Sequence, residues 1–236
     1  MSEFSQYQQI DLLVKAVQYG DLDFVQKSIQ SYKLSPNTLD ASNCSLLHWA
    51  AINGRFEIVE FLVNQNANVN ICGGDNAETP LQWAVRYQNC AKVVHLLLAE
   101  HSNLNHKSIY GYDALYLAVQ AGNINVVYML LNSGADPNTR DLYGDTPLHW
   151  QLKNDLSNAN KWDMIRLLCK FHADVTFKGK DGNNALHILC NMGSNFDFHG
   201  AFYIYCSGGK PLLSAENNDG ETPYQVLFYI INTIYM

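Results

Sequence analysis

TPLQWAVRYQN, residues 79–89, has two close relatives elsewhere in the chain, SLLHWAAINGR at 45–55 and TPLHWQLKND at 146–155. Each copy opens with Ser or Thr, called here the marker residue, and carries a tryptophan four residues later. The marker position recurs at intervals of 34, 34, 34, 33, 38 and 38 residues, at Asp11, Ser45, Thr79, Asp113, Thr146, Asn184 and Thr222. Self-similarity at this period predicts an array of stacked repeats.

Every repeat has the sequence features of a helix pair. The marker side chains can accept a hydrogen bond from the free N–H groups of a first helical turn, and proline follows the marker in three copies. Glycine two residues before the marker suits a tight turn, at Gly111, Gly144, Gly182 and Gly220. Glycine nine residues after it can end the first helix, at Gly20, Gly54, Gly122 and Gly193. Apolar runs such as IVEFLV and VVYMLL then predict the second helix.

This pattern resembles the ankyrin repeat, which has a period of about 33 residues and a T-P-L-H-x-A signature. It predicts an all-α ankyrin-repeat solenoid of about seven units in a single domain, residues 1–236, with degenerate terminal units. The units begin near residues 11, 45, 79, 113, 146, 184 and 222. Gln88 and Asp155 replace the glycine that ends the first helix, which predicts another turn geometry there. Insertions at 156–162 and 194–211 lengthen two units, and the sequence assigns them no role.

The composition argues against several classes of function. The 15 basic and 22 acidic residues give a net charge of −7, without the basic stripe that a nucleic-acid-binding protein needs. No apolar stretch approaches the roughly 20 residues of a membrane span, and the N-terminus lacks the features of a signal peptide. We therefore expect a cytoplasmic monomer with no nucleic-acid partner and no direct membrane insertion.

The cysteines and histidines give no support for a metal site. None of the six cysteines forms a C-x-x-C pair. His48, His149 and His187 share one repeat position, in units about 10 Å apart, which is too far to bind one ion. We expect them to form structural hydrogen bonds at a helix start, with Gln82 in the same role. The sequence predicts no catalytic residue, no metal and no cofactor.

The tryptophans suggest a binding surface. Trp49, Trp83 and Trp150 lie four residues after a marker, and residues four apart share a helix face. Tyr19, Asn53 and Tyr87 lie at the next position on that face, and in an ankyrin stack the first helices line the concave side. Aromatic rings beside amides suit an extended peptide. The alternative is that each tryptophan packs between neighbouring helices, where ankyrin repeats commonly carry leucine.

The stretch from Leu46 to Arg86 resembles the ankyrin region of the huntingtin-interacting protein S-palmitoyltransferases, which carry a zinc-binding Asp-His-His-Cys domain. The features that it shares are the HWAAIN phrase, the Gly-Gly turn and the TPL-x-W-A phrase. The resemblance implies an array that recruits substrate proteins through disordered segments of the type Val-Val-x-x-Gln-Pro. It implies Asn53 and Trp83 as peptide-binding residues, with Tyr87 in the same column and Trp49 and Tyr19 as further groove positions.

The chain departs from that family in one important respect. It contains no Asp-His-His-Cys motif and no membrane span, so we expect no transferase activity from the chain as given. It would be a fragment or truncated form of such an enzyme, on the cytosolic face of Golgi or vesicle membranes in a full-length transferase. The alternative is a stand-alone ankyrin scaffold or adaptor with unrelated partners.

Overall fold

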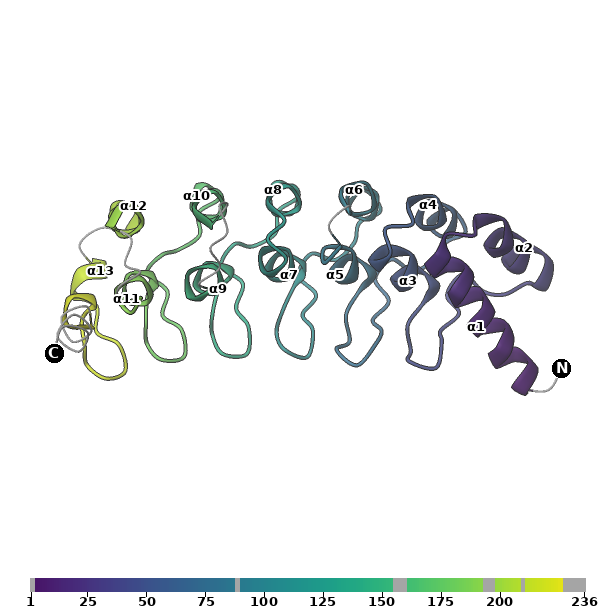
Figure 1. Ribbon diagram of the computed structural model, residues 1–236, viewed down its shortest axis with the longest axis horizontal. Coiled ribbons are helices and arrows are strands. Elements are labelled where there is room, and N and C mark those ends of the chain that lie inside the picture. Colours follow the sequence, from purple (N-terminus) through teal and green to yellow (C-terminus); the bar gives the residue numbers. More distant parts are fainter. Residues whose placement is uncertain (1–2, 88–89, 155–160, 193–197, 209–210, 227–236) are drawn as a thin grey trace. The chain divides into compact units, whose positions relative to one another are not determined.

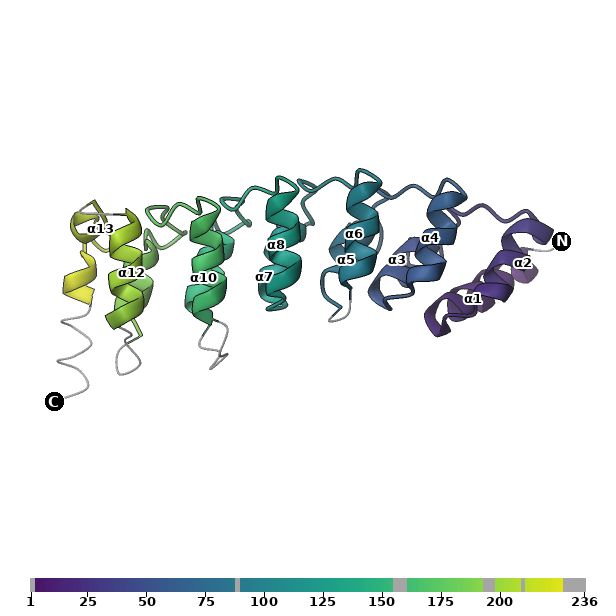
Figure 2. The same ribbon diagram turned by 90° about the horizontal axis from the view of Figure 1, so that it is seen from above.

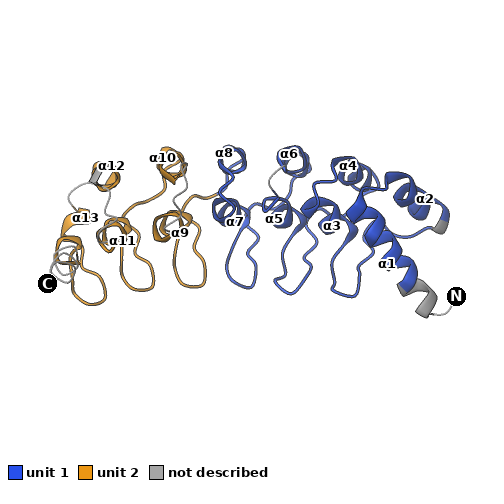
Figure 3. Cartoon of the chain, viewed as in Figure 1, with its two compact units in different colours: residues 1–135 blue, residues 136–236 orange. Residues whose placement is uncertain are grey.

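The protein consists of helices joined by turns, in two compact units (Figure 3). The computed structural model describes residues 3–87, 90–154, 161–192, 198–208 and 211–226. Unit 1 is residues 1–135 and unit 2 is residues 136–236. Within the described residues the only extended pairings are two isolated bridges, Leu39 with Ser45 and Gly73 with Glu78.

Unit 1 contains four helix pairs (Figure 1). The first helices are α1 (Glu3–Tyr19), α3 (Leu46–Ile52), α5 (Pro80–Ala84) and α7 (Ala114–Gln120). The second helices are α2 (Leu22–Tyr32), α4 (Phe56–Asn64), α6 (Ala91–Ala99) and α8 (Ile124–Asn132). First helices pack side by side in one layer, and second helices pack in another layer (Figure 1), so each pair contacts its neighbours through both layers. From above, the helices of each layer run side by side along the unit (Figure 2).

Unit 2 repeats this arrangement in a less regular way. Its helices are α9 (Pro147–Lys153), α10 (Lys161–Lys170), α11 (Ala185–Cys190), α12 (Phe198–Gly208) and α13 (Pro211–Ser214). Helix α9 packs on α10 and on α11, and α11 packs on α12. The predicted insertion at 194–211 is therefore corrected: its residues 198–208 form α12, the second helix of their unit. Residues 155–160, 193–197 and 209–210 lie outside the described part.

The marker residues cap the first helices, as the sequence predicts. Ser45, Thr79, Asp113, Thr146 and Asn184 have extended backbones, and each side chain accepts from the backbone N–H three residues later. Thr222 makes the corresponding contacts with Gln225. The first marker is the exception. Helix α1 begins at Glu3, so Asp11 lies inside a helix and is exposed, and the prediction that it starts one is wrong.

The predicted glycine turns are also present. Gly20, Gly54 and Gly122 follow their first helices with φ of +86°, +64° and +69°. This left-handed conformation ends a helix at little cost only when no Cβ is present. Gly193, Gln88 and Asp155, the other residues at this repeat position that the sequence singles out, lie outside the described part of the chain.

The core of each unit lies between its two helical layers. Leucine and valine side chains from both layers are fully buried there in unit 1, including Leu47, Leu62, Leu81, Leu97 and Leu130. Burial of each such side chain contributes about 1.5–3 kcal/mol. Among the described helices, none combines the length and the apolar character needed to cross a membrane.

Candidate functional site

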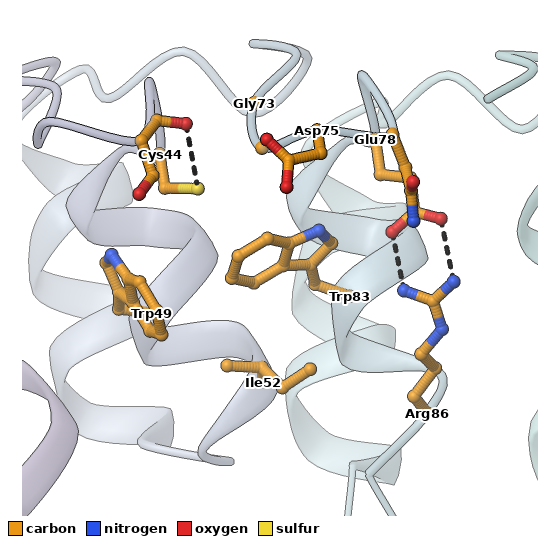
Figure 4. Close-up of a pocket in the computed structure, with 11 residues that line it drawn as sticks. Cys44, Trp49, Ile52, Gly73, Asp75, Glu78, Trp83 and Arg86 are labelled. Carbon is orange, nitrogen blue, oxygen red and sulfur yellow. Dashed lines mark hydrogen bonds and ion pairs between the residues drawn. The ribbon is translucent and has the colours of Figure 1, made fainter. Parts of the chain in front are cut away.

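A hollow of about 360 Å³ lies between α3 and α5 in unit 1 (Figure 4). The two helices form one wall, and the turns that precede them form the other. Eleven residues line it: Ser42, Cys44, Trp49, Ile52, Gly73, Gly74, Asp75, Asn76, Glu78, Trp83 and Arg86. Of the sequence-predicted residues, only Trp49 and Trp83 are among them.

His48 holds the two helices in register beside this hollow. Its Nδ1 accepts from the Ser45 backbone N–H at 3.1 Å, and its Nε2–H donates to the Glu78 carbonyl at 2.8 Å, in the turn before α5. Burial lowers the pKa of His48, which favours the neutral ring that these two bonds require. Each helix start is thereby bonded to the next repeat.

The same device recurs, as the sequence predicts for this repeat position. His149 Nε2 donates to the Phe177 carbonyl at 3.0 Å in unit 2, and His187 Nε2 donates to the Glu221 carbonyl at 2.9 Å. In unit 1 the Gln82 side chain replaces histidine, accepting from the Thr79 N–H at 2.8 Å and donating to the Tyr112 carbonyl at 2.7 Å. These contacts confirm the structural role expected for the histidines and for Gln82.

Both the indole N–H and the ring of Trp49 are held by neighbouring side chains. Its indole N–H donates to Asp40 Oδ2 at 2.8 Å, and Asp40 Oδ1 accepts from the backbone N–H groups of Ser42 and Cys44 at 2.8 and 2.9 Å. Its ring meets the ring of Trp83 edge to face, with centroids 5.4 Å apart and planes at 86°. Trp49 is therefore a rigid wall of the hollow whose polar atom is already bonded.

Trp83 combines packing with exposure. Its ring also meets the ring of His48 edge to face at 5.1 Å, yet the residue stays partly exposed and lines the hollow. Its indole N–H has no hydrogen-bond partner within the described part of the chain. The ring is thus held in place by its neighbours while one polar donor remains available to a ligand.

An ion pair closes one side of the hollow. Arg86 Nη1 and Nη2 lie 2.5 and 2.7 Å from Glu78 Oε2 and Oε1, a bidentate arrangement. The Glu78 side chain is only 2% exposed and that of Arg86 36%. Sequence analysis missed this pair. The same spacing, an acidic residue eight positions before a basic one, occurs at Asp145 and Lys153 in unit 2, whose Oδ2 and Nζ atoms lie 2.7 Å apart. This recurrence in the sequence could have predicted the Glu78–Arg86 pair.

The Gly73–Gly74 turn forms the rim of the hollow. A Cβ on Gly73 would lie 2.5 Å from the Asn43 carbonyl oxygen, so only glycine fits there. Gly74 has φ of +69°. Cys44 lies beneath this turn, and burial, with smaller contributions from the carboxylates of Asp40 and Asp75, raises its thiol pKa to about 11. The thiol is therefore protonated at neutral pH.

The remaining predicted residues lie beside the hollow. Asn53 is the C-cap residue of α3, and its Nδ2 donates to the Trp49 carbonyl at 2.8 Å, which leaves Oδ1 free of any partner among the described residues. The Tyr87 ring lies against Gly54 and is 37% exposed. Tyr19, at the end of α1, is 80% exposed, and Trp150 belongs to α9 in unit 2.

The described residues offer no group of three His, Cys, Asp or Glu side chains that could hold a metal ion. What the hollow presents is a pair of indole rings, an indole N–H, an amide oxygen nearby and several carboxylates. Such a set is suited to binding a segment of another chain.

The family model for ankyrin repeats (three copies) matches residues 13–108, 89–178 and 115–198. The chain belongs to the ankyrin-repeat family. As an ankyrin-repeat chain it is expected to act through contacts with other proteins, and the predicted all-α ankyrin fold is confirmed.

The resemblance to palmitoyltransferases is confirmed as well. ZDHHC13 of Danio rerio is 34% identical over 199 residues, covering 78% of this chain and 30% of that protein. Palmitoyltransferase AKR1 of Lachancea kluyveri is 31% identical over 178 residues, and AKR1 of Debaryomyces hansenii is 30% identical over 227. These matches cover 73% and 91% of this ankyrin-repeat chain but 23% and 26% of the relatives. The chain thus spans less than a third of the length of these relatives.

Proposed function

We propose that this chain is the substrate-recruiting part of a protein S-palmitoyltransferase and binds extended segments of other proteins beside the α3–α5 hollow. The observation that carries the proposal is the Trp49–Trp83 corner. Two indole rings are held by their neighbours at the surface, and the N–H of Trp83 has no partner among the described residues. The palmitoyltransferase relatives give the protein context in which such a surface would recruit substrates.

A segment of the type Val-Val-x-x-Gln-Pro fits this chemistry. The proline would pack on the Trp83 ring, and a peptide carbonyl would accept from the Trp83 indole N–H. The glutamine side-chain amide would donate to Asn53 Oδ1, which has no partner among the described residues, whereas one of the two Asn53 amide N–H groups is already bonded to the Trp49 carbonyl. Tyr87 would extend the apolar contact past the end of α5. Tyr19 lies in α1, beside α3, where it would meet a longer peptide.

In this proposal the ankyrin chain supplies recruitment and no acyl transfer. Its place would be the cytosolic face of the Golgi or vesicle membrane that carries the transferase, where one copy would bind one substrate segment. Size-exclusion chromatography with light scattering tests whether the chain is a monomer.

The test is a calorimetric titration with a Val-Val-Ala-Ala-Gln-Pro peptide. Removing a buried aromatic anchor costs on the order of 2 kcal/mol or more, which is roughly thirty-fold in affinity. Trp83→Ala should therefore weaken binding at least about thirty-fold and leave the helical circular dichroism unchanged. Trp150→Ala is the matched control, because it removes the same side chain from the same repeat position in unit 2, and it should bind as the wild type does.

Two results would count against this function. Binding that survives Trp83→Ala unchanged would remove the site, even if the chain binds the peptide elsewhere. No binding by the wild type would favour a stand-alone scaffold with unrelated partners. If Trp83→Ala loses helicity, Trp83→Phe replaces it: it keeps an aromatic ring and removes the indole N–H that would donate to the peptide, so it should weaken binding about threefold to tenfold, and unchanged binding would count against the site.

A further inference from the structure

Asp75 is a carboxylate in the hollow that the fold does not use. It belongs to the turn before α5, it is exposed, and Figure 4 shows its carboxylate directed toward the Trp83 ring. Among the described residues, no hydrogen-bond donor and no cation lies within bonding distance of its side chain. The other charged side chains described beside it, those of Asp40, Glu78 and Arg86, all form hydrogen bonds or ion pairs.

The charges beside Asp75 can be assigned one by one. Glu78 and Arg86 neutralise each other through two short contacts. The Asp40 carboxylate accepts hydrogen bonds from the Trp49 indole N–H and from two backbone N–H groups. None of these donors is a cation, so Asp40 keeps its negative charge. Two carboxylates without a cation therefore remain at the hollow. Burial is the main cause of the raised pKa of the Cys44 thiol, and each of these two carboxylates adds a smaller contribution to it.

The indole rings add a second attraction for a cation. The faces of tryptophan rings carry negative charge density, and a cation close to a face is stabilised, more strongly when it is partly desolvated. Asp75 and Trp83 line the same hollow, and in the view of Figure 4 the Asp75 carboxylate is drawn above the Trp83 ring. A cation placed there would contact a carboxylate and an indole ring together.

We infer that the bound segment carries a Lys or Arg close to the residue that packs on Trp83, and that Asp75 receives this side chain. The inference rests on the proposed function, because it concerns the same peptide. It adds a charge requirement that the Val-Val-x-x-Gln-Pro pattern does not contain. The helical side of the hollow takes the apolar residue, and the side formed by the turns takes the cation.

The experiment is a scan with two sets of peptides. Each peptide contains Val-Val-Ala-Ala-Gln-Pro, and a single Arg occupies in turn each of the three positions on either side of this sequence. The matched set carries Gln at the same positions. Affinities are measured by fluorescence anisotropy with the wild type, Asp75→Asn and Glu60→Gln, at two salt concentrations. Glu60 is an exposed acid on α4, so its variant changes the net charge equally in the other helical layer.

At one or two adjacent positions, Arg should bind the wild type about fivefold more tightly than Gln at low salt, and less so at high salt. Asp75→Asn should abolish that difference, and Glu60→Gln should keep it. Equal binding of Arg and Gln peptides at every position would overturn the charge requirement and leave the peptide site standing. A preference for Arg that persists in Asp75→Asn would also overturn it. No binding of any peptide would overturn both proposals.

Discussion

Trp49 and Trp83 meet edge to face across adjacent repeats, with ring centroids 5.4 Å apart and planes at 86°. They occupy the same position in consecutive repeats, yet their polar atoms differ in role. The Trp49 N–H is bonded to Asp40 in the turn before α3, whereas the Trp83 N–H has no partner in the described structure. One ring is therefore mainly structural, and the other has a surface and a donor to offer.

Trp49→Phe should lower stability without removing the aromatic wall. The change deletes the hydrogen bond to Asp40 and leaves Oδ2 of that carboxylate without its donor. Hydrogen bonds to charged groups contribute about 1.5–3 kcal/mol, and partial exposure here reduces the expected loss to about 1–2 kcal/mol. Urea unfolding of the wild type and of Trp49→Phe measures this loss of stability. Trp83→Phe is the control and should cost less, because its N–H makes no such bond; an equal or larger loss would contradict the assigned roles.

Arg86→Ala should cost more stability than Lys153→Ala. Each substitution strips the cation from an acid eight residues earlier, but the Glu78 side chain is 2% exposed and that of Asp145 is 14% exposed. A buried carboxylate without its partner costs about 3–5 kcal/mol, and the partial exposure of Arg86 reduces this to about 2–3 kcal/mol. Chemical denaturation of both variants checks the order. Glu78→Gln added to Arg86→Ala should recover part of the loss; no recovery would argue against an uncompensated charge as the cause.

Acid should destabilise the array through its buried histidines. Burial lowers the pKa of His48, His149 and His187 below the ordinary value of 6.5. Between 6.5 and the lower folded-state values, the unfolded chain binds more protons than the folded chain. Stability is therefore fully present above about pH 6.5 and is lost as the pH falls from there toward the folded-state pKa.

His48→Gln tests this pH dependence. Gln82 shows that glutamine can cap the helix and bond the next repeat in this fold. The variant should stay within about 1 kcal/mol of wild type at pH 7 and lose less stability between pH 7 and pH 5, measured by urea unfolding. An undiminished loss in His48→Gln would show that this ring does not titrate as inferred.

Gly73→Ala should be far more damaging than Gly134→Ala. A Cβ on Gly73 would press on the Asn43 carbonyl oxygen at 2.5 Å and on the buried His48 ring at 3.0 Å, and neither can move freely. Gly134 has φ of +93° and nothing within 4 Å of a Cβ, so its substitution carries only the conformational cost, about 1 kcal/mol. Overpacking at Gly73 should cost about 2–3 kcal/mol in denaturant unfolding. Equal effects would mean that the turn before α5 relaxes more readily than its contacts suggest.

Cys44 should resist alkylation. Its pKa of about 11 leaves roughly one thiol in a thousand or fewer ionised at pH 7.5, and the residue is buried. Iodoacetamide should modify it at least about a hundredfold more slowly than the exposed Cys72, as followed by peptide mass spectrometry. Comparable rates would indicate that the turn at Gly73–Gly74 opens often.

The sequence by itself determined the repeat, the helix starts and the structural role of the histidines. These follow from local rules: a capping side chain, a proline and a glycine act on the turn in which they occur, and a fixed period brings equivalent residues into line. The rule failed at Asp11, which lies inside α1 and not at its start. It failed also at 194–211, where the lengthened spacing concealed α12.

Only the tertiary structure decided the composition of the hollow. Trp49 and Trp83 were predictable because they repeat. Asp75, Glu78 and Arg86 were not, because their roles depend on which atoms meet across two repeats and on how deeply each is buried. The same contacts show that one N–H of the Asn53 side chain is bonded inside α3, whereas the Trp83 indole N–H has no partner among the described residues. A periodic sequence specifies which positions face one another, and only packed side chains determine which of their polar atoms remain for a partner.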